Sequence, residues 1–245
     1  MKRIIKFIFK LLSTVLVISI IGLICIGAYY GVSGYREYKN VLEECSLETK
    51  IASIRNRENY VTIEQLPKIY VDAVIAVEDH NFYSHGAVSI VSTVRAIVTN
   101  LKDRDYTQGG STITQQVAKN LYFTQEKKLT RKVAEMFMAI ELEKHYSKDE
   151  IFEFYVNNIY FGSGYYNIYD ASMGYYSVHP SQLNDYQATI LAGVPNAPSV
   201  YSPDNNSPLT GQRQQQVLDS MVEYGFIKES EAENILNINQ KEAIN

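Results

Sequence analysis

Three short segments of the sequence bring together residue types that can do chemistry. The first is Glu78-Asp79, which ends an apolar run and is followed by His80 and His85. Partial desolvation at the end of an apolar helix makes a carboxylate a better general base. A role in capping the local backbone fits either acid equally well. Two histidines and one aspartate do not complete the four ligands of a zinc site.

The second segment is rich in glycine, hydroxyl and amide groups. Gln108 and two glycines precede Ser111, which is placed to cap a helix that runs to Asn120. A glycine-rich loop that opens a helix offers backbone N–H groups and the positive end of the helix dipole to an anion, and Lys119 adds charge nearby. Serine and threonine are also ordinary helix caps, so this segment alone does not distinguish an anion site from a common helix start.

The third segment concentrates positive charge between two glutamates. Its cations are Lys127, Lys128, Arg131 and Lys132. On a helix, Lys127, Arg131 and Glu135 would share one face because they are four residues apart. An exposed pair of Arg131 with Glu135 would contribute only about 0.3–0.5 kcal/mol. Concentrated cations suit a phosphate or pyrophosphate ligand better than such a pair.

The charge of the whole chain is divided unevenly. Residues 1–30 hold four of the 23 Lys and Arg residues and none of the 27 acids, so residues 31–245 carry a formal charge of −8. That acidic balance argues against nonspecific binding of nucleic acid, which needs a basic surface. The usual signatures of serine acyl transfer, of P-loop proteins and of zinc peptidases are absent from the sequence. Asp103-Arg-Asp105 has the form of a metal motif, but so short a polar run between helices is usually a solvated turn.

The N-terminal region predicts a membrane anchor. Leu11 to Tyr30 are 20 consecutive uncharged residues, which as a helix span about 30 Å. The positive charges precede this run, so the N-terminus is expected in the cytoplasm and the rest of the chain outside. A cleaved signal peptide is the alternative, although the run is longer than a usual signal and no small-x-small cleavage site follows. Cys25 lies within the run; Cys45, beyond it, is either a free thiol or a link between two chains.

Helices are the elements that must position the three segments. A capping box at Thr62–Gln65, with Pro67 in the first turn, predicts a helix that ends at Glu78 with one buried face. A second helix is expected from Val88 to Leu101. Helical spacing of apolar residues predicts a further one that carries Val133, Met136, Phe137 and Ile140.

A second capping box, at Ser147–Glu150, predicts that two helices meet at Tyr146–Ser147. Two terminal helices are expected around Val217 and Ile235, and strand-type alternation is scarce, so the expected fold class is mainly α. The expected organisation is a basic segment at 1–10, a transmembrane helix at 11–30, a stem at 31–60 and one domain at 61–245.

Four motifs in this order behind an anchor resemble the peptidoglycan glycosyltransferases (glycosyltransferase family 51). The resemblance runs from about Thr62 to Met221, and the second motif is highly specific by itself. The motifs are Glu78-Asp-x-x-Phe-x-x-His85, Gly109-Gly-Ser-Thr-Ile-Thr-Gln-Gln116, Arg131-Lys-x-x-Glu135 and the run Lys148–Gly162. Because motifs for acyl transfer are missing, the chain resembles the monofunctional, membrane-anchored members.

The resemblance implies a lysozyme-like, bilobal glycosyltransferase domain. It would polymerise lipid II into glycan strands on the outer face of the bacterial plasma membrane. Glu78 would be the general base that deprotonates the acceptor 4-hydroxyl, and Glu135 would act in the donor region. Cations would neutralise the pyrophosphate, namely Lys119, Lys127 and Arg131. The residues expected to line the cleft are Ser111, Thr112, Gln115 and Gln116.

The resemblance also implies ligands and partners. A divalent ion, Mg or Mn, would be bound to the substrate pyrophosphate, with no metal site in the protein itself and no organic cofactor. The expected partners are lipid II, the growing glycan chain, the membrane and other cell-wall synthesis proteins. The protein would cross the membrane once.

Some positions depart from the family pattern, and two other functions compete. Ala87 and Ser89 stand where the family usually has Gly and Asp, and Lys127 and Gln214 stand where it usually has Arg. Lysine keeps the charge but loses bidentate phosphate binding, so weakened activity is expected. A lysozyme-like glycan hydrolase would also use Glu78 but would need no pyrophosphate site. An inactive, membrane-anchored scaffold is the other alternative.

Overall fold

The computed structural model describes residues 2–89, 110–124, 126, 128–205 and 207–242, and these residues form helices and no β-strand. The prediction of a mainly α fold is therefore confirmed. Most of the predicted helix Val88–Leu101, together with Asp103-Arg-Asp105, Gln108 and Lys127, lies outside the described residues. The α-helices are α1 (Lys2–Glu44), α2 (Leu47–Arg55), α3 (Lys68–Glu78), α5 (Ile113–Tyr122), α6 (Leu129–His145), α7 (Lys148–Val156), α8 (Ile168–Tyr176), α9 (Asp185–Gly193), α10 (Pro198–Tyr201), α11 (Pro208–Glu223) and α12 (Glu229–Glu242).

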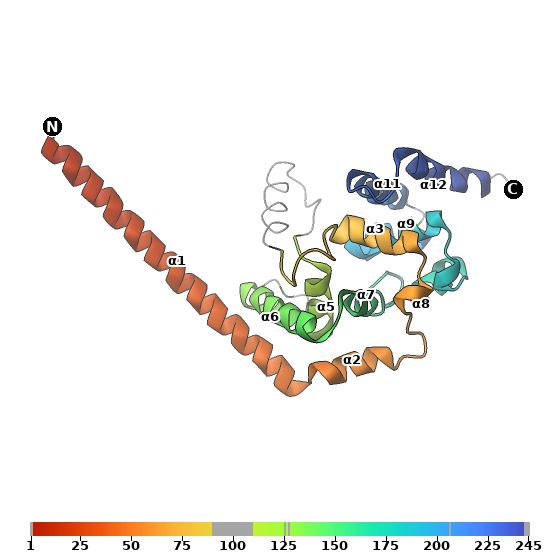
Figure 1. The fold of residues 1–245 in the computed structure, drawn as a ribbon, viewed down its shortest axis with the longest axis horizontal. Coiled ribbons are helices and arrows are strands. Elements are labelled where there is room, and N and C mark those ends of the chain that lie inside the picture. The colour runs from red at the N-terminus through yellow and green to blue at the C-terminus, as the bar shows by residue number, and fades with distance from the viewer. Residues whose placement is uncertain (1, 90–109, 125, 127, 206, 243–245) are drawn as a thin grey trace.

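Helix α1 is one unbroken helix that runs away from the rest of the molecule (Figure 1). Its most apolar window of 18 residues has a mean hydropathy of 2.6 and none of it is buried against protein. The side chains along this part are large and apolar, and most of them are exposed. Helix α1 is therefore long and apolar enough to cross a membrane.

The last third of α1 packs on α6 instead of standing free. Gly34 allows the close contact, because a Cβ atom placed there would lie 2.6 Å from the Cβ of Val133. The ring of Phe137 lies 5.3 Å from that of Tyr35 and 5.9 Å from that of Tyr38, measured between centroids. Contacts of this closeness fix the direction in which α1 leaves the domain.

Helix α6 therefore has two packed faces. The predicted stripe that includes Val133 and Phe137 is half-buried or exposed, and these two residues contact α1. The predicted helix is confirmed, but its most hydrophobic stripe is not the face that packs in the core. The core face carries smaller residues together with one acid: Ala134, Glu135, Met138, Ala139 and Leu142.

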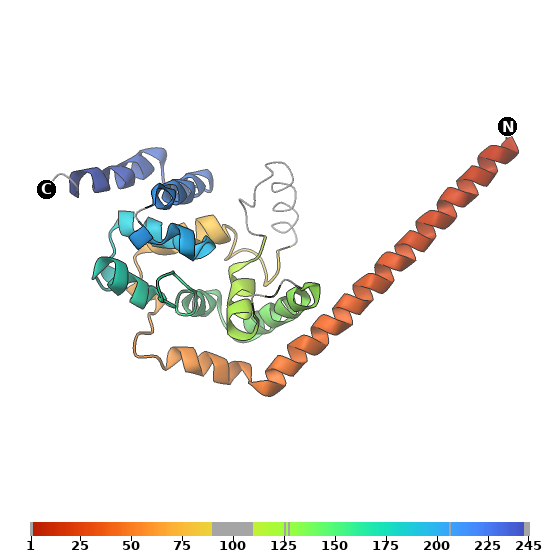
Figure 2. The same cartoon turned by 180° about the vertical axis from the view of Figure 1, so that it is seen from behind.

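Residues 47–60, part of the predicted stem, contribute to the core. Leu47, Ile51 and Ile54 of α2 are buried, and α2 runs beneath α6 and α7 in both views (Figures 1 and 2). The guanidinium of Arg57 donates to the backbone carbonyl of Asn157 at 2.8 Å. This segment is therefore held against the domain by apolar and polar contacts.

Helix α3 begins later than its capping box suggested. The box is real, since the N–H of Thr62 donates to Oε1 of Gln65 at 2.9 Å, but it caps a 3₁₀ turn at Ile63–Gln65. Leu66 precedes Pro67 and is extended, with ψ 138°. A residue before proline is sterically kept from the helical region. The prediction that Pro67 sits inside the first turn is wrong, because α3 starts at Lys68.

The remaining helices form two groups. Helices α3, α9, α11 and α12 pack on one another, and α5 packs against both α6 and α7. The predicted junction at Tyr146–Ser147 is confirmed, because Ser147 caps α7 and forms a capping box with Glu150. Both predicted terminal helices are also present, as α11 and α12.

Candidate active site

The end of α3 meets the beginning of α5 at Glu78. This half-buried carboxylate accepts a hydrogen bond from Nε2 of Gln116, at 2.7 Å to its Oε2. The first and second predicted segments therefore come together at one point. The amide holds one carboxylate oxygen in place.

The neighbouring carboxylate, Asp79, is buried and has a structural role. Its Oδ2 accepts the backbone N–H of Ile113, the first residue of α5, at 3.1 Å. Its Oδ1 lies 2.5 Å from Nε2 of His85, whose Nδ1 contacts the carbonyl of Gly86. An acid at a helix N-terminus is also favoured by the helix dipole. Asp79 therefore joins the end of α3 to the start of α5.

The two histidines of the first segment contact different residues. While His85 pairs with Asp79, the ring of His80 stacks on Tyr224, with centroids 3.9 Å apart and planes inclined by 7°. Within the described part of the chain, no group of three or more His, Cys, Asp or Glu residues could hold a metal ion.

Replacement of Asp79 by alanine is expected to lower the free energy of unfolding by about 1–3 kcal/mol. The N–H of Ile113 and the imidazole of His85 would both lose their buried acceptor. Urea unfolding followed by circular dichroism measures the change. Asp79→Asn is the matched control and should lose less, because its amide oxygen can still accept one hydrogen bond. An unchanged midpoint for the alanine variant would contradict this assignment.

Helix α5 is capped one residue later than predicted. Thr112, not Ser111, is the N-cap, and it forms a capping box with Gln115. The hydroxyl of Thr112 also donates to the carbonyl of Ala87 at 2.7 Å. Because Ala87 contributes its backbone oxygen there, this contact does not depend on its side chain. Thr112 and Gln115 are buried in these local contacts, whereas Gln116 reaches Glu78.

The cationic segment surrounds a buried acid. Glu135 is only 1% exposed and pairs with Arg131 and with Lys132, whose Nζ lies 3.1 Å from Oε2. This burial excludes an ordinary surface pair of Arg131 with Glu135. Nζ of Lys132 also donates to the hydroxyl of Ser111 at 2.7 Å. Lys132 was not among the predicted site residues, although it stands inside the Arg131–Glu135 motif.

Lys119 links the carboxylate end and the cationic end of the site. Burial lowers the pKa of its ammonium below the usual value, and the cations Lys132 and Arg131 lower it further. The carboxylates Glu135 and Glu78 oppose this lowering. Lys119 is therefore close enough to all four charges to interact with them electrostatically. The structure thus brings Glu78, Gln116, Lys119, Arg131 and Glu135 near one another, while Thr112 and Gln115 cap α5.

One departure from the family pattern, Gln214, lies between two helices. Gln214 is buried between α9 and α11, and its Nε2 donates to Oγ1 of Thr189 at 2.9 Å and to the carbonyl of Tyr186 at 3.1 Å. Its neighbour Arg213 is also buried and donates to the carbonyl of Gly193, the last residue of α9, at 3.2 Å. Gln214 therefore fills a structural position between helices.

The chain is similar to known proteins over most of its length. Residues 47–222 match the family model described as transglycosylase. A monofunctional glycosyltransferase of Staphylococcus epidermidis is 40% identical over 194 residues, which are 76% of this chain and 72% of that protein. The same-named protein of Staphylococcus aureus is 37% identical over 195 residues, 77% of this chain and 72% of its own length. Penicillin-binding protein 1A of Aquifex aeolicus is 40% identical over 178 residues, 73% of this chain but 24% of that protein. Because the family model matches residues 47–222 and these relatives are 37–40% identical over most of the chain, the chain belongs to the transglycosylase family and is a peptidoglycan glycosyltransferase.

Proposed function

We propose that Glu78 is the general base of glycan polymerisation. Its carboxylate takes the proton of the acceptor 4-hydroxyl, and the acceptor oxygen forms a bond to C1 of the growing chain. The bond from C1 to the lipid pyrophosphate breaks at the same time, so the pyrophosphate leaves with its electron pair and the configuration at C1 is inverted. The observation that carries this proposal is that α5 contacts Glu78 through Gln116 and also carries Lys119, whose ammonium interacts electrostatically with Glu78 and with the charges of α6.

The cations of α5 and α6 are assigned to the donor pyrophosphate. Lys119, Arg131 and Lys132 lie around Glu135, which neutralises part of their charge. When Glu78 takes up a proton, the site becomes more positive by one charge while negative charge develops on the leaving group. Preorganised cations of this kind stabilise a transition state more than they stabilise the bound substrate. Lys127 is assigned to the same group by its motif alone.

A divalent ion is proposed to arrive with the substrate. Mg²⁺ is commonly bound through substrate phosphates and only one or two carboxylates. Glu135 is held by two cations, which suits it to positioning those cations rather than to serving as a strong metal ligand. The pyrophosphate would therefore supply most of the oxygen ligands of Mg²⁺ or Mn²⁺.

The orientation in the membrane is also a proposal. Four positive charges precede the apolar part of α1, and charges of both signs follow it. The positive-inside rule then places the N-terminus in the cytoplasm and the site outside. Lipid II and the growing chain are substrates anchored by lipid, so they would reach the site along the outer leaflet.

The function is tested with the purified full chain in vesicles that contain labelled lipid II and a divalent ion. Long glycan products are expected, and a muramidase should degrade them. Shortening of preformed glycan by the chain alone would support the hydrolase instead. No reaction with either substrate would leave the scaffold as the function.

The lowered pKa of Lys119 gives an expected pH dependence. Because its pKa lies below the usual value, Lys119 loses its charge at a lower pH than an exposed lysine. The KM for lipid II should therefore rise on the alkaline side, measured between about pH 7 and 10. Lys119→Arg should flatten this rise, because a guanidinium stays charged throughout. Parallel pH profiles for the two proteins would exclude Lys119 as the titrating group.

A further inference from the structure

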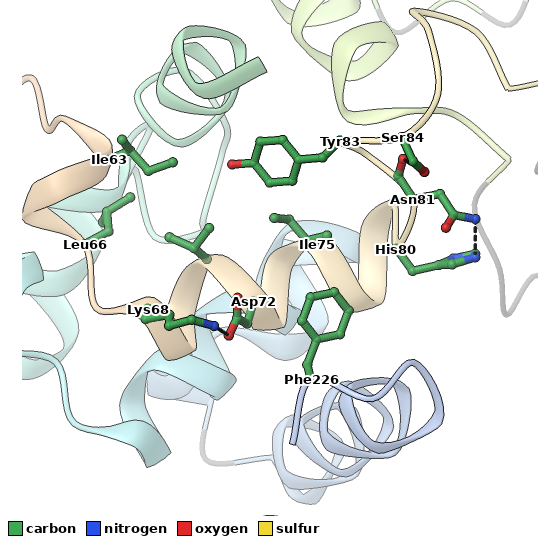
Figure 3. Close-up of a pocket in the computed structure, with 11 residues that line it drawn as sticks. Ile63, Leu66, Lys68, Asp72, Ile75, His80, Asn81, Tyr83, Ser84 and Phe226 are labelled. Carbon is green, nitrogen blue, oxygen red and sulfur yellow. Dashed lines mark hydrogen bonds and ion pairs between the residues drawn. The ribbon is translucent and has the colours of Figure 1, made fainter. Parts of the chain in front are cut away.

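A groove lies along one side of α3, outside the cluster of charges just described (Figure 3). It encloses about 520 Å³, a size typical of sites for small ligands. Its walls are mostly apolar and come from α3, from the segments on either side of it and from the turn after α11. The apolar side chains that form them are Ile63, Leu66, Val71, Ile75, Tyr83 and Phe226.

The two ends of the groove are polar. Lys68 and Asp72 form an ion pair at the end near the start of α3, as Figure 3 shows. At the other end lie His80 and Asn81, whose side chains are hydrogen-bonded at 2.9 Å, with Ser84 beside them. A ligand that fills the groove would therefore need apolar groups along its length and polar groups at its ends.

The groove lies along the same helix as the proposed catalytic base. Val71, Ile75 and Glu78 follow one another at spacings of four and three residues, so they form one row along α3. From Lys68 to Glu78 the helix rises about 15 Å at 1.5 Å per residue. An extended peptide of about four or five residues has the same length.

We propose that the groove binds the peptide carried by the sugar that reacts beside Glu78. This inference rests on the proposed function, because the peptide is part of the lipid-linked disaccharide substrate. Short apolar side chains would contact Val71, Ile75 and Phe226. The ammonium of Lys68 would meet a peptide carboxylate, and Asp72 would accept from a peptide N–H or ammonium group.

The charges and the size of the groove favour a peptide over other occupants. An uncharged glycan offers no ionic group to the exposed ammonium of Lys68 or to the carboxylate of Asp72, whereas a peptide can offer one to either. A protein partner of ordinary stability covers about 800 Å² of each surface, which is far more than a groove of this size offers. A short peptide uses both the apolar wall and the ion pair.

One wall of the groove comes from a part of the chain beyond residues 47–222, the range that matches the family model. Gly225 has φ 76° and makes the turn that brings Phe226 back, where its N–H donates to the carbonyl of Met221 at 2.8 Å. The stack of Tyr224 on His80 joins this turn to the segment after Glu78. Selectivity for the peptide would therefore depend on residues outside the matched region.

The test compares two substrates: lipid II with its full peptide and the same lipid-pyrophosphate disaccharide without peptide. The wild type should use the peptide-bearing substrate with a kcat/KM higher by roughly tenfold. Phe226→Ala and Lys68→Glu should bring this ratio close to one. Matched controls, Tyr166→Ala and Lys144→Glu, change an exposed aromatic ring and an exposed lysine of an ion pair elsewhere, and should keep the wild-type ratio.

Each other result has a definite meaning. If the wild type makes polymer from both substrates with equal kcat/KM, the peptide site is wrong and the polymerase stands. If neither substrate gives polymer, the proposed function itself fails. An equal loss on both substrates in the groove variants would indicate a sugar site, and unchanged kinetics in them would indicate a protein partner; both overturn the proposal. The side chain of Lys68 is 86% exposed, so Lys68→Glu remains informative if Phe226→Ala unfolds.

Discussion

Replacement of Glu78 by glutamine is expected to lower kcat for lipid II polymerisation by roughly 10²–10⁴-fold. Glutamine has nearly the same size, and its amide oxygen can still accept the hydrogen bond from Gln116. It cannot take the proton of the acceptor hydroxyl at neutral pH. The loss should therefore fall on kcat, with little change in KM or in the melting temperature.

Single-turnover polymerisation with labelled lipid II measures this loss separately from binding. Glu126→Gln is a matched control, because the exposed carboxylate of Glu126 pairs with the exposed Lys128, whereas Arg131 donates to the backbone carbonyl of Glu126, which the substitution keeps. It should keep most of the activity. Full activity of Glu78→Gln would remove Glu78 from the role of base, whatever the control shows.

Replacement of Glu135 by alanine is expected to affect both stability and activity. Removing one partner of a buried ion pair costs about 3–5 kcal/mol. Here Lys132 is 38% exposed and Arg131 is 14% exposed, so solvent reduces the effect to about 2–3 kcal/mol. The two cations would also lose the acid that orients them, and lipid II should be used with a much lower kcat/KM.

A double variant separates the two effects. Glu135→Ala together with Lys132→Ala removes one uncompensated cation, so part of the unfolding free energy should return. Activity should not return, because the proposed pyrophosphate site then lacks both groups. Urea unfolding and lipid II kinetics on the same preparations provide the comparison. Recovery of activity along with stability would show that Glu135 has only a structural role.

A capping box in the sequence predicted where a helix begins when no proline followed it closely. Ser147 and Glu150 form a box directly before an apolar run, and the structure has that box at the start of α7. At Thr62 the same signal was followed by Pro67, whose steric effect on Leu66 separated the box from the long helix. The capping box shows that a helical turn begins, but a proline that follows closely limits the length of the helix.

The faces of α6 could not be predicted from periodicity alone. The larger apolar residues, such as Phe137, point to α1, a segment that the sequence pattern assigned to the membrane and a stem. Small residues such as Ala134 and Ala139 face the core, together with the charged Glu135. Only the tertiary contact with α1 explains why the more hydrophobic stripe is on the outer side.

The order of the three segments and their residue types were enough to predict that they form one site. The hydrogen-bond partner of each side chain depended on which residue caps α5. With the cap at Thr112, the third helical position falls on Gln115, whose side chain turns back to the cap. Gln116 is then free to reach Glu78. Placing the cap at Ser111 instead assigns these amides to the wrong positions, so the sequence identified the segment but not the side chain that contacts the base.

The packing of α1 on α6 has a consequence for the height of the site above the bilayer. Gly34 follows the last residue of the apolar run, Tyr30, by four residues, or about 6 Å along the helix axis. The headgroup layer on each side of a bilayer is about 5–8 Å thick. With the apolar run in the membrane as proposed, α1 works as a spacer that holds the first turns of α6 at the level of the lipid phosphates. A pyrophosphate on its lipid can then meet Arg131 and Lys132 without lifting its chain out of the bilayer.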